Sequence, residues 1–139
     1  MIVLPLLFIA SFLFAQKSDS TSNANTVDND TTVYTKVDTE ASFPGGQQGW
    51  IKFLQHNLNA GVAADDGAKV GNYIIWVKFI VTKEGHVKNI VAETKNGFGT
   101  EEEVKRVILS GPDWKPAKLN GKPVNSYKRV SQGFDITEG

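Results

Sequence analysis

YIIWVKFIVTKEGHVKNIVAET, residues 73–94, is the stretch of sequence that decides the fold. Its first part, Tyr73–Thr82, is apolar at nearly every position on both faces of a period-two pattern, which is typical of a strand at the centre of a sheet. Lys83-Glu84-Gly85-His86 predicts a hairpin turn, because Gly85 can adopt positive φ at low cost. Val87–Thr94 is then the return strand. The sequence therefore predicts an antiparallel hairpin at the centre of the sheet.

Two helices are predicted, one before this hairpin and one after it. Gln47–Leu58 has apolar residues at helical spacing along one face, so this helix packs that face on the sheet. Thr100 and Glu103 have the spacing of a capping box, which predicts that the second helix begins there. Gly111-Pro112 ends that helix.

The remaining elements are three strands and one long loop. Thr32–Val37 is a β-branched and aromatic run that predicts a first strand, and Asn59–Asn72 is a small-residue loop of the kind that is often mobile or functional. Trp114–Leu119 leads into the hairpin signal Asn120-Gly121, and Lys122–Ile136 returns as the last strand. The predicted fold class is α+β in the order β-α-β-β-α-β-β. Two helices pack on one face of a three- to four-stranded antiparallel sheet.

The amino-terminal region predicts export. Residues 1–15 are almost entirely apolar and would form a helix about 22 Å long, shorter than the roughly 30 Å hydrocarbon core of a bilayer. We therefore expect a signal peptide cleaved at Ala15-Gln16, with a short membrane anchor as the alternative. Residues 16–32 consist mostly of Ser, Thr, Asn and Asp and are predicted to be a disordered tether. Residues 33–139 are the domain.

Composition excludes several function classes. The chain has 15 Lys plus Arg against 15 Asp plus Glu, so it lacks the basic field that nucleic-acid binding requires. It contains no cysteine, which excludes disulfides, zinc–thiolate sites and thiol catalysis.

No residue pattern predicts catalysis, a cofactor site or a metal site. His56 and His86 are the only histidines, one on a helix and one in a turn, and no carboxylate pair accompanies either in the sequence. Asp65-Asp66 lacks the alternating oxygen ligands of a calcium loop. The acidic run Glu101–Glu103 suits the first turn of a helix, where the helix dipole favours negative charge. We therefore expect a protein that is not an enzyme.

An ordered set of motifs resembles the C-terminal domain of the TonB family, the energy transducers of Gram-negative envelopes. The matching segments are Phe43-Pro44-Gly45-Gly46, Val77–Val87, Glu102-Glu103-Val104, Trp114-Lys115-Pro116-Ala117 and Asn120-Gly121-Lys122-Pro123-Val124. The most recognisable family positions among them are Phe43, Pro44, Gly45, Gly46, Trp114, Pro116, Asn120 and Gly121.

This resemblance implies a periplasmic module that docks the TonB-box peptide of outer-membrane transporters by strand addition, linked to energised transport. The implied partners are a TonB-dependent transporter and, for energised members, an inner-membrane energising complex. In strand addition, a guest peptide pairs with unpaired backbone groups on a sheet edge. The implied docking edge is 124–134, with peptide-binding residues Val124, Tyr127, Arg129, Val130, Gln132 and Phe134.

Two other functions stay open at the level of sequence. One is an inner-membrane-anchored energy transducer whose amino terminus is truncated or mis-started, since no positive charge precedes the apolar run. The other is a secreted binding or structural domain that uses loop 59–72.

Overall fold

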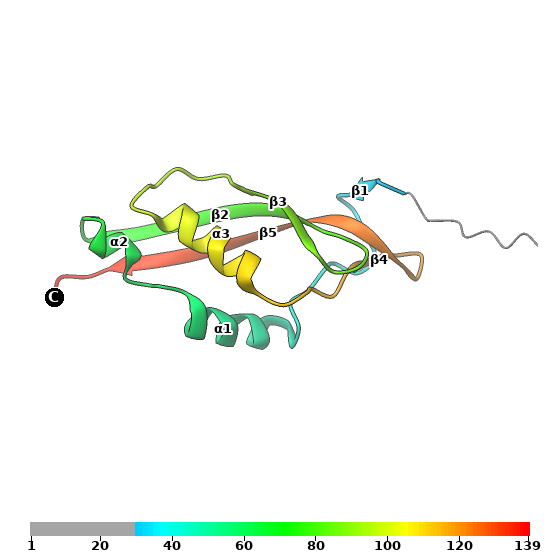
Figure 1. The fold of residues 1–139 in the computed structure, drawn as a ribbon, viewed down its shortest axis with the longest axis horizontal. Coiled ribbons are helices and arrows are strands. Elements are labelled where there is room, and N and C mark those ends of the chain that lie inside the picture. The colour runs from blue at the N-terminus through cyan, green and yellow to red at the C-terminus, as the bar shows by residue number, and fades with distance from the viewer. Residues whose placement is uncertain (1–29) are drawn as a thin grey trace, which may run out of the picture.

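Residues 30–139 are described by the computed structural model of the chain, so the predicted signal segment and most of the predicted tether lie outside the described residues. Figure 1 shows long strands side by side, with helices α1 and α3 against them. The elements in chain order are β1 (Val33–Tyr34), α1 (Gly46–Asn57), α2 (Val62–Asp65), β2 (Gly71–Val81), β3 (Val87–Ala92), α3 (Thr100–Ser110), β4 (Ala117–Leu119) and β5 (Lys122–Ile136).

The sheet is built around β2. Its strand order is β1-β5-β2-β3, and β4 pairs with β5 off this path. β2 and β5 are antiparallel in one unbroken register, from Gly71 opposite Ile136 to Val81 opposite Ser126. β2 is therefore paired along both edges, as its two apolar faces predict for a central strand.

The α+β class is confirmed, but the prediction of an antiparallel sheet is wrong. The sheet has five strands and is mixed, because β1 runs parallel to β5 with Val33 opposite Asn125. The Asn125 side-chain amide donates to the backbone oxygen of Thr32 at 3.3 Å, which holds this entering segment. A strand that reaches the sheet from far away in sequence has no tight turn to impose an antiparallel direction.

Two predicted elements differ from the observed ones. Only Val33–Tyr34 of the predicted strand Thr32–Val37 pairs with the sheet. The chain then turns away, so that the backbone N–H of Thr39 donates to the backbone oxygen of Lys118 at 3.1 Å. The predicted loop 59–72 contains the short helix α2, an element absent from the predicted order, in which Ala63 is completely buried.

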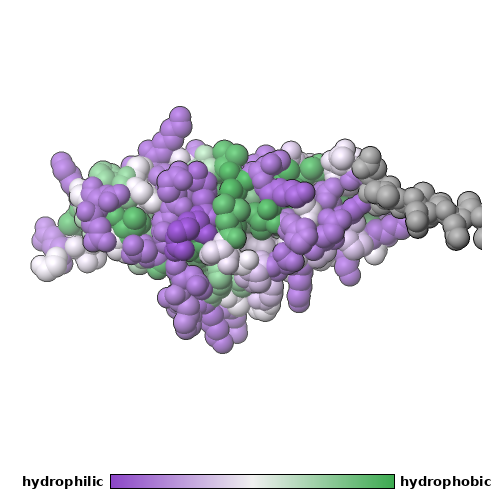
Figure 2. Space-filling view, viewed as in Figure 1, coloured by the Kyte–Doolittle hydropathy of each residue, from purple (hydrophilic) through white to green (hydrophobic). Residues whose placement is uncertain are grey.

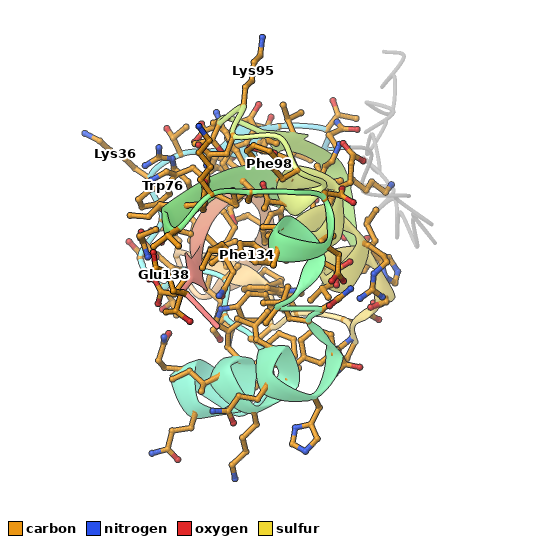
Figure 3. The ribbon with its side chains drawn as sticks, turned by 90° about the vertical axis from the view of Figure 1, so that its left-hand side faces the viewer. Lys36, Trp76, Lys95, Phe98, Phe134 and Glu138 are labelled. Carbon is orange, nitrogen blue, oxygen red and sulfur yellow. The ribbon has the colours of Figure 1, made fainter. Side chains whose placement is uncertain are left out.

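The core lies under one face of β2. Ile75, Val77 and Phe79 are completely buried there, together with residues of both longer helices. Figure 3 shows Phe134 pointing into this interior and Trp76 on the opposite side of the sheet. Around Phe79 the core is aromatic. The ring centroid of Trp114 lies 5.2 Å from that of Phe79, 5.5 Å from that of Phe43 and 5.6 Å from that of Trp50. The face seen in Figure 2 is largely hydrophilic, with apolar residues in small patches.

The predicted capping box of α3 is wrong. Gly99, with φ of 71°, occupies the N-cap position, and no side chain caps the helix. Thr100 therefore lies inside the first turn, where its hydroxyl donates to the Gly97 backbone oxygen at 2.7 Å. The Glu103 carboxylate accepts instead from the Asn59 backbone N–H at 2.7 Å and from Arg106 Nη2 at 2.6 Å. The left-handed backbone of Gly99 turns the chain into the helix one residue early.

Glu103 should make stability depend on pH. The hydrogen bonds from Arg106 outweigh the opposing effect of burial, and together with the Asn59 N–H they lower the pKa of the Glu103 carboxyl. A lowered folded-state pKa means that the unfolded chain binds the proton more tightly, so this stabilisation is complete above the ordinary glutamate pKa of about 4.3 and is lost as pH falls below it. Glu103→Gln should therefore weaken the acid dependence of urea unfolding midpoints.

Glu102→Gln is the matched control for this prediction, because the Glu102 side chain is 77% exposed in the same helical turn. Equal acid dependence in the wild type and in Glu103→Gln would show that this carboxylate contributes nothing to the effect.

Candidate functional site

β5 has one long unpaired edge. Along its other edge it pairs with β2 from Ser126 to Ile136. β4 pairs only with residues 122–124, and β1 only with Asn125 and Ser126. Within residues 30–139, no strand pairs with the outer edge of β5 beyond Tyr127.

Hydrogen bonds on the far side of β2 show which backbone groups of β5 face outward. The Trp76 backbone oxygen accepts from the Glu93 N–H at 2.8 Å, and the Thr82 N–H donates to the His86 oxygen at 2.8 Å. Even-numbered residues of β2 therefore direct their backbone groups toward β3, and odd-numbered ones toward β5. The β5 residues opposite these odd residues are even-numbered. The residues whose N–H and C=O groups both face the open edge are thus Arg129, Ser131, Gly133 and Asp135, while the parallel pairing with β1 occupies the N–H of Tyr127.

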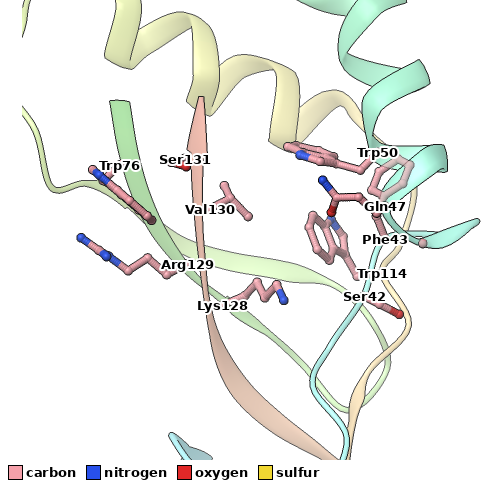
Figure 4. A pocket seen from close by; sticks show the side chains of 11 residues that line it. Ser42, Phe43, Gln47, Trp50, Trp76, Trp114, Lys128, Arg129, Val130 and Ser131 are labelled. Carbon is pink, nitrogen blue, oxygen red and sulfur yellow. The ribbon is translucent and has the colours of Figure 1, made fainter. Parts of the chain in front are cut away.

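A cavity of about 380 Å³ lies along this edge (Figure 4). One wall is β5 itself, from Lys128 to Ser131. The opposite wall is formed by the chain just before α1 and by the first turns of α1, from Ser42 to Trp50. Trp114 and Trp76 complete the lining. Its walls come from segments far apart in the sequence, and we call this cavity the edge groove.

The opposite edge of the sheet, β3, is built differently. It is short, and its pairing with β2 shifts register between Lys78 and Ile80, where Asn89 has φ of 53°. Such a bulge, with the exposed Lys88 beside it, is a usual way to block unwanted strand pairing. β5 has no register shift against β2. The two edges therefore differ in their capacity to accept another strand.

The predicted peptide-binding residues fall into three groups. Arg129 presents both of its backbone groups at the open edge, and Tyr127 presents its C=O. Val130 and Gln132 direct their backbone groups to β2, while their side chains are half-buried on the core side. Val124 pairs with Ala117 in the β4–β5 hairpin, and Phe134 is a core residue that is 2% exposed.

The predicted family positions are structural. Gly45 is the N-cap of α1 with φ of 81°, and Gly46 follows with φ of 67°. Pro44 precedes them, with its backbone oxygen against the helix, and Pro116 leads into β4. Asn120 and Gly121 form the β4–β5 turn with φ of 51° and 75°. Phe43 and Trp114 belong to the aromatic core already described.

Sequence reasoning missed several residues of the site. Ser42, Gln47, Lys128 and Ser131 line the edge groove, but no pattern in the sequence relates the first turn of α1 to β5. Gly49 was missed as well. A Cβ atom there would lie 2.1 Å from the Pro44 backbone oxygen, so only glycine lets the chain before α1 fold back on the helix.

The two histidines have local partners. His86 Nδ1 lies 3.0 Å from a carboxylate oxygen of Asp113, and His56 Nδ1 lies 2.7 Å from the Lys52 backbone oxygen. Among residues 30–139, no three His, Asp or Glu side chains are placed to hold a metal ion. Across the same part of the chain, every helix is too short or too polar to cross a bilayer.

Comparison of the chain with known protein families, with curated proteins and with solved structures gave no match.

Proposed function

We propose that residues 33–139 form a protein-binding module that takes an extended segment of a partner onto the open edge of β5 by strand addition. The observation that carries the proposal is the coincidence of an unpaired strand edge with the edge groove. Unpaired N–H and C=O groups supply affinity for any extended backbone, and a groove beside them can select alternate side chains. A cavity also lies between β3 and α3, but β3 is a short strand with a bulge, which makes its edge a poorer template for an added strand.

The resemblance to TonB C-terminal domains suggests the partner. On this proposal the guest is the TonB-box peptide of an outer-membrane transporter, and the module acts in the periplasm after export through a signal peptide, linked to energised transport. Helices α1 and α3 both contribute buried residues to the core beneath β2, which supports the family layout of two helices on one face of the sheet. Because β4 and β1 pair with residues 122–126, the proposed docking edge is 129–135, where the implied edge was 124–134.

Strand addition makes a prediction about the peptide backbone. TonB-box peptides from transporters of the same organism should bind in titration calorimetry. Every second amide of a bound peptide should pair with β5. N-methylation of that set of amides should weaken binding at least about tenfold, because it removes the N–H groups that pair with β5. N-methylation of the other alternate set, whose amides face solvent, should leave affinity nearly unchanged. An equal loss of affinity on N-methylation of either set, or no binding of the unmodified peptides, would contradict the proposal.

A further inference from the structure

Lys128 is one of two cations that line the edge groove, and Arg129 is the other. Lys128 lies on the core-facing side of β5, and its side chain is only 23% exposed. Its Nζ lies 3.3 Å from Glu40 Oε2, in a chain segment outside the sheet. The Glu40 side chain is 82% exposed. The Lys128 side chain is thus mostly buried in the groove, while the Glu40 side chain that neutralises it lies mostly in solvent.

The edge groove has both polar and apolar lining, and its apolar side chains, Trp76 apart, lie on the core side of β5. Val130 follows two residues later on the same face of β5, and Phe43, Trp50 and Trp114 lie across from it (Figure 4). The buried indole Nε1 of Trp114 has no hydrogen-bond partner among the described residues.

Arg129, the neighbouring cation, lies on the other face of the sheet and is already engaged. Its guanidinium lies 3.8 Å from the centre of the Trp76 ring, and it forms an ion pair with Glu93. Both partners belong to β2 or to the residue directly after β3, so this pair is anchored within the sheet. Lys128 is therefore the cation whose partner a guest can replace at small structural cost.

A guest strand on β5 would place its side chains in register with these features. Side chains two residues apart point to the same face of a strand, and pairs directly opposite one another across two strands interact. Guest residues opposite Lys128 and Val130 would both enter the groove, separated by one outward-facing residue.

On the basis of the proposed function, we infer that the guest carries a carboxylate that replaces Glu40 on Lys128, two residues from a bulky apolar side chain that fills the groove beside Val130. Glu40 is then an intramolecular competitor that keeps Lys128 neutralised in the free protein. The partner class is an extended peptide with alternating acidic and apolar residues on one face.

Designed peptides test this inference. The probes are capped TDTFTVT and its asparagine counterpart TNTFTVT, with the reversed pair TVTFTDT and TVTFTNT because a guest strand can pair in either direction. Affinities come from titration calorimetry, with tryptophan fluorescence as a second readout. The wild type should bind an aspartate peptide more tightly than its asparagine counterpart in at least one direction.

Two variants and one control separate the contributions. Glu40→Gln should raise affinity for the aspartate peptide about two- to fivefold, the range of a partly exposed ion pair, and leave the asparagine peptide unchanged. Lys128→Gln should remove the discrimination between the two peptides. Glu84→Gln, which removes an exposed acid of the β2–β3 turn that does not line the groove, should bind like the wild type. Thermal melts of all variants establish that they are folded.

The outcomes are distinguishable. The inference is supported if the aspartate peptide binds more tightly than the asparagine peptide, and if the substitutions at Glu40 and Lys128 change this difference while Glu84→Gln does not. Equal affinity for aspartate and asparagine peptides overturns it and leaves strand addition intact, provided that TonB-box peptides bind. If neither the designed peptides nor the TonB-box peptides bind, the proposed function fails and this inference fails with it.

Discussion

Replacing Ser131 with proline should abolish peptide binding while changing the free energy of unfolding by only about 1 kcal/mol. The Ser131 N–H faces the open edge of β5, because its neighbours Val130 and Gln132 direct their backbone groups to β2. Proline removes that donor and places its ring where a guest strand would approach. The substitution should therefore weaken peptide binding and leave the hydrogen bonds within the sheet intact.

Val130→Pro is the comparison variant, because it should lower the free energy of unfolding much more than Ser131→Pro. Val130 lies opposite Val77, which is completely buried at the centre of β2. Its N–H belongs to the ladder inside the sheet, so proline there should cost about 3 kcal/mol or more. Ser131→Ala removes only the side-chain hydroxyl and should bind like the wild type. Urea unfolding and titration calorimetry give both quantities.

Each result has a clear reading. Full peptide binding by a folded Ser131→Pro protein would place the guest elsewhere. A larger loss of stability in Ser131→Pro than in Val130→Pro would mean that the two residues face the opposite edges from those inferred.

Gly85→Ala should destabilise the domain by about 3 kcal/mol. Gly85 has φ of +93°, and a Cβ atom there would lie 2.3 Å from the Trp114 backbone oxygen. The left-handed conformation costs a residue with a side chain about 1–2 kcal/mol, and displacing packed backbone adds about 1–3 kcal/mol. The Trp114 N–H also donates to the Gly85 oxygen at 2.8 Å, so a shift that relieves the clash breaks this bond.

Gly121→Ala is the matched control, because Gly121 also lies in a hairpin turn, with φ of +75°, and has nothing within 4 Å of an added Cβ atom. It should cost only the conformational part, about 1 kcal/mol. Chemical denaturation compares the two variants directly. Equal destabilisation would mean that the contact between the β2–β3 turn and the chain before β4 contributes little.

Local patterns predicted the elements whose conformation depends on near neighbours. The Gly85 turn, the Asn120-Gly121 turn and α1 are present where they were predicted, because each depends on residues within a few positions. The start of α3 is the instructive exception. Thr100 and Glu103 have capping-box spacing, but Gly99 takes the cap position and tertiary contacts with Asn59 claim the Glu103 carboxylate.

The candidate site depended on contacts that no local pattern reports. The parallel pairing of β1 with β5 joins residues that are distant in sequence, and so do the two walls of the edge groove. In the sequence, Lys128 is an ordinary lysine in a strand. Only the fold brings Glu40 and the chain before α1 against it.

The sequence by itself determined which face of β2 is buried, because side chains alternate between the two faces of a strand and apolar ones favour the core. It did not determine which backbone groups of β5 are free. Those groups alternate between the two edges of the strand with the same period of two, but every residue except proline carries the same N–H and C=O. The tertiary structure pairs one edge of β5 with β2 and leaves the other edge unpaired beyond Tyr127. Only this pairing decided that the backbone groups of Ser131 face outward and those of Val130 face β2.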